Sequence, residues 1–401
     1  MTGSAFPGGC LVRAENTPSC RFRSRETPAT GDQVSRRRTT APTTSHPSQS
    51  RNKTTPAPWP PRESIVRLTA ASDAIVVGTV QATEGNATVA FCIQVERVLK
   101  GTLIPGSAVS LIWTSPRTQF PYGESRSVTG HGLFFLQRTS SGSWALLPAT
   151  AGDAGWEDTY VATPVDVARA VRDAALASLP ANASPLDGVL AEMVMAREAD
   201  ASMPFDFVEI FRESQSAVLA SAFTRFRTAS KPSLALIGLR GRVQMGDSSA
   251  ISTAQQRHKA LSSSSGWRAL LEEIRVHYLN TSAQAIQSLG QIVTDPGTGM
   301  DLRLAAAGAL ARMHTRRSLP YLAALLDDRD SKLRTMAVGG LARFANNVPI
   351  GSHEPAPGPW PYRTDDTITH SAIDEARIEA PGSDYLSFWR SWWREHAGVL
   401  K

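Results

Sequence analysis

The residues best suited to metal binding or acid–base chemistry lie in one polar segment, 351–374. It contains two histidines and three aspartates: His353, Asp365, Asp366, His370 and Asp374. Imidazole nitrogens and carboxylate oxygens bind divalent metals and also transfer protons. Their spacing follows neither a helix nor a strand, and ordinary polar loops have the same composition. We therefore expect no metal, no cofactor and no catalytic residue, and we keep an enzyme that uses this loop as an alternative.

Cysteine is the second source of reactive side chains, and the chain has three: Cys10, Cys20 and Cys92. An odd and sparse set is not a disulfide framework, and no CxxC pair suggests zinc. Cys92 is most simply a small buried apolar residue in a strand. A bridge between Cys10 and Cys20 is left open.

Short catalytic motifs do not occur in the sequence. HExxH, GxSxG, GxGxxG and Walker A patterns are all missing. Arg303 and Arg334 have the chemistry to bind an anion, but we favour a structural role in which each bonds an acidic residue of a neighbouring helical repeat.

Composition separates a basic tail from a balanced body. Residues 1–61 hold nine Arg or Lys against three acidic residues, with nine Pro and seventeen Ser or Thr. This segment cannot bury enough apolar area to fold, so we predict a disordered tail that is dispensable for folding. Residues 62–401 hold 33 basic and 33 acidic side chains. The body therefore shows no nucleic-acid footprint, whereas binding of the tail to nucleic acid or an anionic surface is an alternative.

Segments for targeting or membrane insertion are not evident. No stretch of 18 apolar residues is present, so we expect no transmembrane segment. The tail lacks the apolar core of a secretion signal, which leaves the compartment unknown. One explanation of the tail is a start codon assigned too far upstream.

Residues 62–148 predict a small β domain. A short helix is expected over 64–71, followed by strands at 74–80 and 89–95 around an Asn86 turn. Further strands are expected around 109–113, 133–136 and 144–147, where apolar residues alternate or cluster. Five strands in this length indicate a barrel or sandwich.

The pattern of these strands resembles a netrin-like, OB-barrel-related domain of bacterial extracytoplasmic proteins. The likeness rests chiefly on Val95 to Gly101 and Gly132 to Leu136. It implies an extracytoplasmic location. Metalloproteinase inhibitors of that broad fold chelate zinc through an N-terminal cysteine, and no cysteine begins this domain, so that activity is not implied.

Helical patterns fill residues 165–344. We expect a helix over 164–179 with Val167, Val171 and Leu176 on one side, and helices that begin near Pro204 and Pro232. Leu190 with Val194, and Val208 with Phe211, lie at helical spacings. A further helix is expected over 267–279.

A direct repeat stands near the end of this region. Residues 301–313 (DLRLAAAGALARM) and 332–344 (KLRTMAVGGLARF) are identical at seven of thirteen positions, 31 residues apart. Residues 318–328 between them predict a second helix. Two helices in a period near 30 are typical of a solenoid, with Leu302, Ala306, Leu310 and Met313 as the buried stripe. Arg312 and Arg343 are expected to face solvent.

This repeat resembles the HEAT-like repeat of the phycobilisome-lyase type. Residues 235–251 resemble a degenerate upstream unit with its turn at Gly246 and Asp247. The resemblance implies a bacterial HEAT-repeat protein but no lyase activity, because nothing identifies the pocket residues of such an enzyme.

An irregular loop is expected over 345–382, followed by an aromatic helix over 383–398. Six aromatic or imidazole side chains recur at helical spacing: Tyr385, Phe388, Trp389, Trp392, Trp393 and His396. We interpret this helix as a cap over the last repeat. A platform for sugar or peptide is the alternative.

The sequence thus predicts an α+β multidomain chain, a small all-β barrel or sandwich followed by an all-α HEAT-like solenoid. Its expected function is a non-enzymatic scaffold that binds a protein or peptide.

Overall fold

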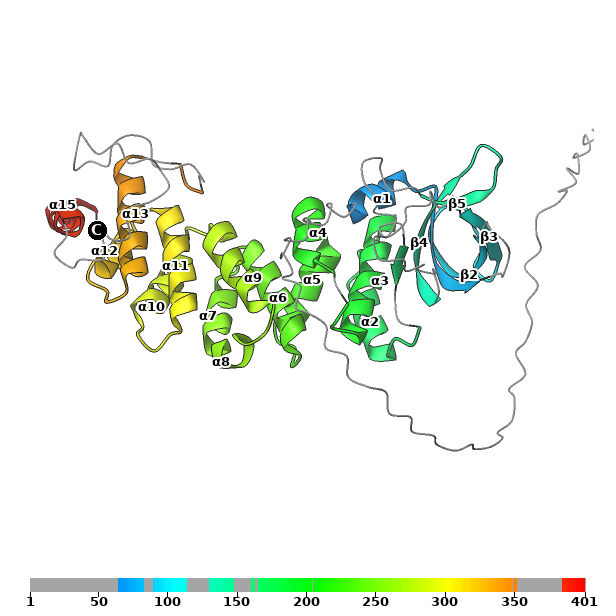
Figure 1. The fold of residues 1–401 in the computed structure, drawn as a ribbon, viewed down its shortest axis with the longest axis horizontal. Helices are drawn as coiled ribbons and strands as arrows, with labels where there is room; N and C mark the ends of the chain where they lie inside the picture. Colours follow the sequence, from blue (N-terminus) through cyan, green and yellow to red (C-terminus); the bar gives the residue numbers. More distant parts are fainter. Residues whose placement is uncertain are drawn as a thin grey trace, which may run out of the picture. The chain divides into compact units, whose positions relative to one another are not determined.

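The structure, a computed structural model, describes residues 64–82, 89–113, 130–147, 160–162, 165–203, 205–347, 349–351 and 384–400 (Figure 1). The chain divides into two compact units between Ala162 and Thr163. The predicted tail 1–61, with Cys10 and Cys20, lies outside the described residues.

The first unit is a small β-barrel, which decides between the barrel and the sandwich expected from the sequence. Helix α1 (Ile65–Ala71) precedes the strands β1 (Ala74–Ala82), β2 (Val89–Lys100), β3 (Ala108–Trp113), β4 (Gly130–Arg138), β5 (Trp144–Leu146) and β6 (Tyr160–Ala162). Strands β1, β2, β3, β5 and β4 follow one another around the sheet, and pairing of β1 with β4 closes it. Strand β6 pairs with β4 beyond the predicted end at 148.

Alternating apolar residues fill the barrel. The core cluster comes from alternate positions of four strands: Ala74, Val76, Val80, Ile93, Val95, Val109, Leu111, Phe134 and Leu136. Strands β1 and β2 approach closely at Gly78, where an added Cβ would lie 2.3 Å from the Gln94 carbonyl oxygen. The pairing register shifts between Val77 and Gly78, as at a β-bulge, so the strand bends there and helps the sheet to close.

Cys92 of β2 is buried, as predicted, but it is also disulfide-bonded, so its interpretation as a merely apolar residue was wrong. An odd number of cysteines does not prevent one of them from pairing. The other two cysteines of the chain are not among the described residues.

The second unit is helical in all its described elements. The helices that begin it are α2 (Arg169–Ala177), α3 (Pro185–Ala199), α4 (Phe207–Ser214), α5 (Ala217–Phe226), α6 (Pro232–Gln244), α7 (Ser248–Gln256), α8 (His258–Leu261) and α9 (Trp267–Glu272). The π-helix η2 (Glu273–His277) continues α9 directly. Then follow α10 (Ala283–Thr294), α11 (Met300–Met313), α12 (Leu319–Leu325), α13 (Ser331–Ala345) and α15 (Asp384–Leu400).

Local sequence signals explain most helix boundaries. Ser184 and Asp187 form a capping box at the start of α3, and Asp330 caps α13 with its carboxylate. Gly246, at φ +77°, takes the left-handed conformation that ends α6, and Asp247 then caps α7. The turn predicted at Gly246 and Asp247 is therefore confirmed.

Two expectations in the first helical segments need correction. Helix α2 begins at Arg169 rather than near 164, and Leu176 is exposed instead of lying on a buried stripe. Its buried side chain is Ala175, and among the described helices its main packing neighbour is α3. Pro232 does begin α6, whereas α4 begins at Phe207 after an Asp206 cap; Pro204 is not among the described residues.

From α6 onward the main contacts join the helices into two rows. Helices α6, α9 with η2, α11 and α13 contact one another in turn and form the α11 row. Helices α7, α10, α12 and α15 form the α10 row, and α10 with α11 and α12 with α13 pack across the two rows. Figure 1 shows these helices side by side in chain order.

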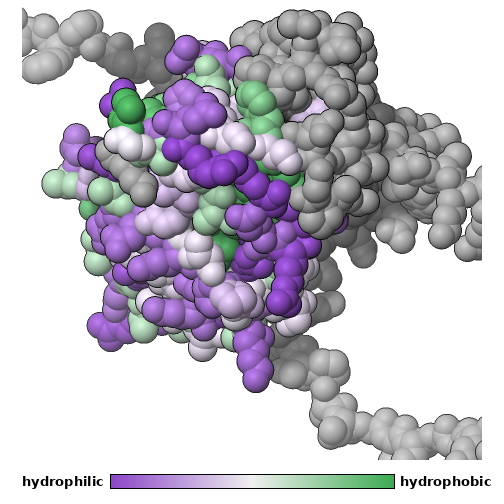
Figure 2. Space-filling model, turned by 90° about the vertical axis from the view of Figure 1, so that its left-hand side faces the viewer, coloured by the Kyte–Doolittle hydropathy of each residue, from purple (hydrophilic) through white to green (hydrophobic). Residues whose placement is uncertain are grey.

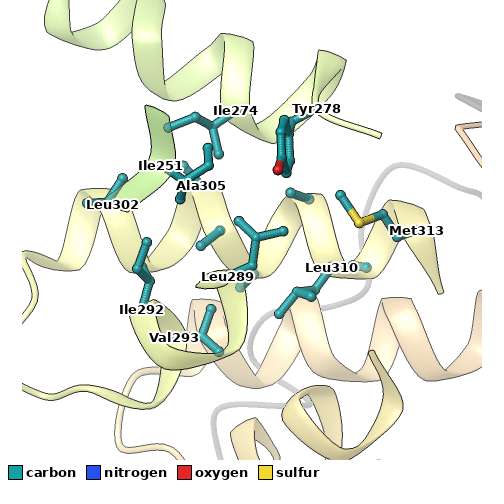
Figure 3. Close-up of a cluster of buried hydrophobic side chains, with 14 of the residues drawn as sticks. Ile251, Ile274, Tyr278, Leu289, Ile292, Val293, Leu302, Ala305, Leu310 and Met313 are labelled. Atoms are coloured by element: carbon teal, nitrogen blue, oxygen red, sulfur yellow. The ribbon is translucent and has the colours of Figure 1, made fainter. Parts of the chain in front are cut away.

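A continuous apolar core lies between the rows. Figure 3 shows Ile274 and Tyr278 above α11, and Leu289, Ile292 and Val293 of α10 below it. All four residues of the predicted stripe on α11, Leu302, Ala306, Leu310 and Met313, are fully buried. Small residues let the helices approach: a Cβ on Gly340 would lie 2.9 Å from the Ala311 Cα of the neighbouring helix.

Helix α15 packs against α12 and α13 at the end of the unit. Tyr385, Leu386 and Trp389 are buried, while Phe388, Trp392 and Trp393 are half-buried against the same core. The described residues on the face in Figure 2, which turns this end toward the viewer, are mostly hydrophilic. This arrangement agrees with the interpretation of α15 as a cap, which stays a prediction.

Candidate functional site

The polar segment singled out in the sequence falls almost wholly outside the described residues. Only Gly351 is described; His353, Asp365, Asp366, His370 and Asp374 are not. Among the residues that the structure does describe, no three His, Cys, Asp or Glu side chains come close enough to hold a metal ion. An enzyme that uses this loop stays a hypothesis.

Arg303 and Arg334 are both buried and structural, but the expectation that each bonds an acid of a neighbouring repeat is met only in part. Arg303 is buried on α11, where its guanidinium donates to the Asp328 carboxylate after α12 and to the Val293 carbonyl at 2.8 Å. Arg334, one period later, is also buried and donates to the carbonyls of Asp328 and Arg329 at 2.8 and 2.9 Å. Both arginines thus hold helix connections and are not exposed to a soluble anion.

Arg312 and Arg343 differ from expectation, since both are half-buried rather than solvated. Arg312 donates through Nη2 to the Gly351 carbonyl at 2.6 Å, so the segment that follows α13 returns to the end of α11. Helix geometry did turn these side chains away from the apolar stripe. Gly351 contacts Arg312, which a repeat pattern does not reveal.

Three arginines stand on successive helices of the α11 row: Arg275 on η2, Arg312 on α11 and Arg343 on α13. We call them the arginine row. Arg275 lies across α11, because a Cβ on Gly308 would meet its Cγ at 2.7 Å. Burial, and then the charge of Arg275, lower the pKa of Arg312; burial and Arg312 do the same to the pKa of Arg343. Neighbouring positive charges of the row are therefore close enough to lower each other's pKa, in addition to the effect of burial.

A buried carboxylate extends this charged surface toward α4 and α6. Glu273, the first residue of the π-helix, is 2% exposed, and both its oxygens accept from Arg212 at 2.8 Å. Arg240 of α6 lies 3.7 Å from the same carboxylate. One buried negative charge is thus shared by two arginines, and π-turns often occur at functional positions.

The described residues of this surface carry charges of both signs. Besides Glu273, its described acids include Glu272, which Arg275 contacts at 2.7 Å across one helical turn, and Asp206, which lies 3.5 Å from Arg240. Partial desolvation lowers the pKa of His277 although the residue is exposed, an effect that Glu273 opposes and Arg212 and Arg312 reinforce. Among the described residues, five arginines of this surface therefore lie with three acids, Glu272, Glu273 and Asp206.

The barrel carries a second polar cluster, which sequence reasoning missed. His131 is 8% exposed, and its Nε2 lies 3.0 Å from Glu96 Oε2. Thr79 donates to the other Glu96 oxygen at 2.8 Å. The register that pairs Thr79 with His131 brings them together, and strand alternation places all three outside the barrel core. A His–carboxylate pair can move protons, and here the Thr79 hydroxyl shares the carboxylate with His131.

Comparisons with protein-family models, with curated proteins and with solved structures found no match to this chain. The HEAT-like and netrin-like resemblances thus rest on the sequence patterns alone. Among the described residues, no helix has the length and apolar character needed to cross a membrane.

Proposed function

We propose that this chain is a non-enzymatic scaffold that holds a protein or peptide partner on a HEAT-like helical surface. The observation that carries the proposal is the repeated register of α11 and α13. Leu310 and Leu341 are both fully buried, and Arg303 and Arg334 both bond helix connections. Equivalent positions are thus buried one period apart, which supports a solenoid arrangement.

The arrangement of the helices into two rows supports the same proposal. In a solenoid each unit contacts its neighbours, and one row of helices forms an extended surface for a partner. Here the α11 row presents the arginine row and the Glu273 network on one such surface. Recognition rather than catalysis is the role we propose for it, and the netrin-like barrel then serves as an accessory domain.

Photo-crosslinking on the full chain tests this function. A benzophenone amino acid is placed at His277 on the α11 row, and at Gln291 on the outer side of α10 as the matched control; both side chains are exposed. After irradiation in an extract of the source cells, crosslinked proteins are identified by mass spectrometry. A defined partner that crosslinks from position 277 and not from position 291 is the expected result. No crosslink from 277, or equal crosslinks from both positions, would argue against a scaffold that acts through this row.

A further inference from the structure

We infer that Cys92 ties the basic amino-terminal tail to strand β2 through a reducible disulfide bond, whose other half is Cys10 or Cys20. The tail is held at the barrel under oxidising conditions and released by a thiol reductant. This inference concerns the first compact unit alone, so it does not depend on the scaffold function proposed for the helices.

The partner of Cys92 follows by elimination. Cys92 is disulfide-bonded, and the chain has two other cysteines, Cys10 and Cys20. Both belong to the segment 1–61, so a bond within one chain joins β2 to the tail. More than 40 residues separate Cys20 from Ser64, where the described chain begins. An extended chain advances about 3.3 Å per residue, so its length lets either cysteine reach β2.

The position of Cys92 on β2 supports a bond that leads away from the barrel. Its neighbour Ile93 belongs to the barrel core, and successive side chains of a strand alternate, so Cys92 faces outward with Gln94 and Glu96. Glu96 is exposed and Gln94 is half-buried, whereas Cys92 is only 6% exposed and its Sγ lies 3.7 Å from Ser110 Oγ. A disulfide bond brings a second segment of chain against such a side chain, which agrees with this burial.

The bond determines where a large positive charge lies. Residues 1–61 carry nine Arg or Lys against three acidic residues. A bond from Cys10 or Cys20 to β2 closes a loop that contains the run Arg36–Arg38. Closing a loop reduces the conformations open to the chain. The oxidised protein therefore holds this charge near the barrel, and reduction leaves the tail joined to the barrel at one end only.

Release of the tail needs a dithiol as the co-reactant. One thiolate of the dithiol attacks a sulfur of the bond and forms a mixed disulfide, and its second thiolate then displaces the remaining protein sulfur. The dithiol gives up two electrons and becomes a disulfide, and its two protons pass to the two protein thiols. The intact bond suits an oxidising compartment, in agreement with the extracytoplasmic location that the netrin-like resemblance implies.

Peptide mapping of the full chain tests the bond. The protein is oxidised in a glutathione buffer, open thiols are blocked with N-ethylmaleimide in urea, and the chain is digested without reductant. Trypsin places the cysteines in three different peptides, 1–13 with Cys10, 14–21 with Cys20 and 68–97 with Cys92. We expect the peptide of Cys92 to be joined to one of the other two, and this linked mass to disappear after treatment with dithiothreitol.

Tail variants provide the controls and leave β2 unchanged. In Cys10→Ser with Cys20→Ser, we expect Cys92 to react fully with N-ethylmaleimide before reduction. The matched control is Ser4→Ala with Ser19→Ala, which changes the tail but keeps all three cysteines, and its linked peptide should persist. Circular dichroism melts verify that both variants fold.

Release is measured on a gel after cleavage of the tail. A site for a specific protease replaces residues 42–48, between the tail cysteines and the barrel. After cleavage, we expect the amino-terminal fragment to stay attached without reductant and to separate with dithiothreitol. In the double Cys→Ser variant, the fragment should separate under both conditions.

Three results would overturn the proposal. Cys92 could carry N-ethylmaleimide before any reduction, which would mean that it is not bonded in the oxidised protein. Cys10 could be joined to Cys20, which would leave no partner for Cys92 within the chain. Two copies of the 68–97 peptide could be joined to each other, which would assign the bond to an interface between two chains.

Discussion

Arg303 on α11 donates a hydrogen bond to the carboxylate of Asp328, which lies 25 residues away in the connection after α12. The same guanidinium donates through Nε and Nη2 to the Val293 carbonyl at the end of α10. One buried side chain therefore ties three helices of both rows together. Arg334 holds the same position in the next repeat, where it bonds the carbonyls of Asp328 and Arg329.

Loss of the Arg303 side chain should strongly destabilise the helical unit. Arg303→Ala leaves the Asp328 carboxylate and the Val293 carbonyl in mostly buried positions with fewer donors, at a cost of about 3 kcal/mol. Urea unfolding followed by circular dichroism measures this cost. Arg268→Ala, at an exposed position, should change stability by about 0.5 kcal/mol or less. Equal midpoints for the two variants would show that the Arg303 bonds contribute little.

Leu310 and Leu341 should behave as coupled core positions. Each is fully buried, and their helices contact each other, so Leu→Ala at either site should cost roughly 2–5 kcal/mol. If damage to one repeat loosens the next, the double variant should depart from the sum of the single variants by more than about 0.5 kcal/mol. Urea denaturation of the four proteins provides the cycle, and strict additivity would contradict the coupling.

Gly340 should not tolerate a methyl group. The added Cβ in Gly340→Ala would meet the Ala311 Cα at 2.9 Å, so α13 and α11 must move apart. Such overpacking typically costs about 1–3 kcal/mol, more than the roughly 1 kcal/mol that alanine contributes to helix propensity. Gly398→Ala is the matched control, because a Cβ there meets nothing within 4 Å. Thermal melts should show a lower Tm for the first variant and an equal or higher Tm for the second.

Asp301 should make the stability of the helical unit depend on pH in the acid range. Burial alone raises the pKa of Asp301, but hydrogen bonds from Trp267, His258 and the Leu302 amide together hold it below its ordinary value. A lowered pKa in the folded state means that this stabilisation is complete above the unfolded pKa, near 4, and is lost as the pH falls through the lower folded value.

The free energy of unfolding, measured by urea titration at several pH values between about 5 and 3, checks this expectation. Asp301→Asn should be less stable near pH 6 and should lose less stability on acidification than the unchanged chain. If the free energy of unfolding varied with pH in the same way for both proteins, Asp301 would not be the source of the pH dependence.

Half-buried Arg312 should matter more than a solvated arginine. Arg312→Ala removes the bond to the Gly351 carbonyl and should cost about 1 kcal/mol, compared with about 0.5 kcal/mol or less for the exposed Arg316→Ala. Urea unfolding midpoints distinguish the two variants. If Arg312→Ala left stability unchanged, Arg312 would behave as the solvated residue that the repeat pattern predicts.

The sequence by itself determined the elements whose signals are local. Alternation of apolar residues located five strands, the spacing of Leu302, Ala306, Leu310 and Met313 identified the buried face of α11, and the Gly246–Asp247 turn ended α6. These features depend on residues within a turn or a strand of one another, so a periodic pattern is enough to reveal them. The structural role of Arg303 was accessible as well, because its copy at Arg334 marked it as part of the repeat.

Only the tertiary structure decided which distant residues meet. Closure of the barrel depends on pairing of β1 with β4, which brings His131 opposite Thr79 and beside Glu96. The arginine row depends on how η2, α11 and α13 pack. The hydrogen bond from Arg312 to the Gly351 carbonyl joins the end of α11 to the segment after α13. Such contacts join residues 17 to 68 positions apart in the chain. Their free energy comes from packing and charge in three dimensions, which no short period in the sequence encodes.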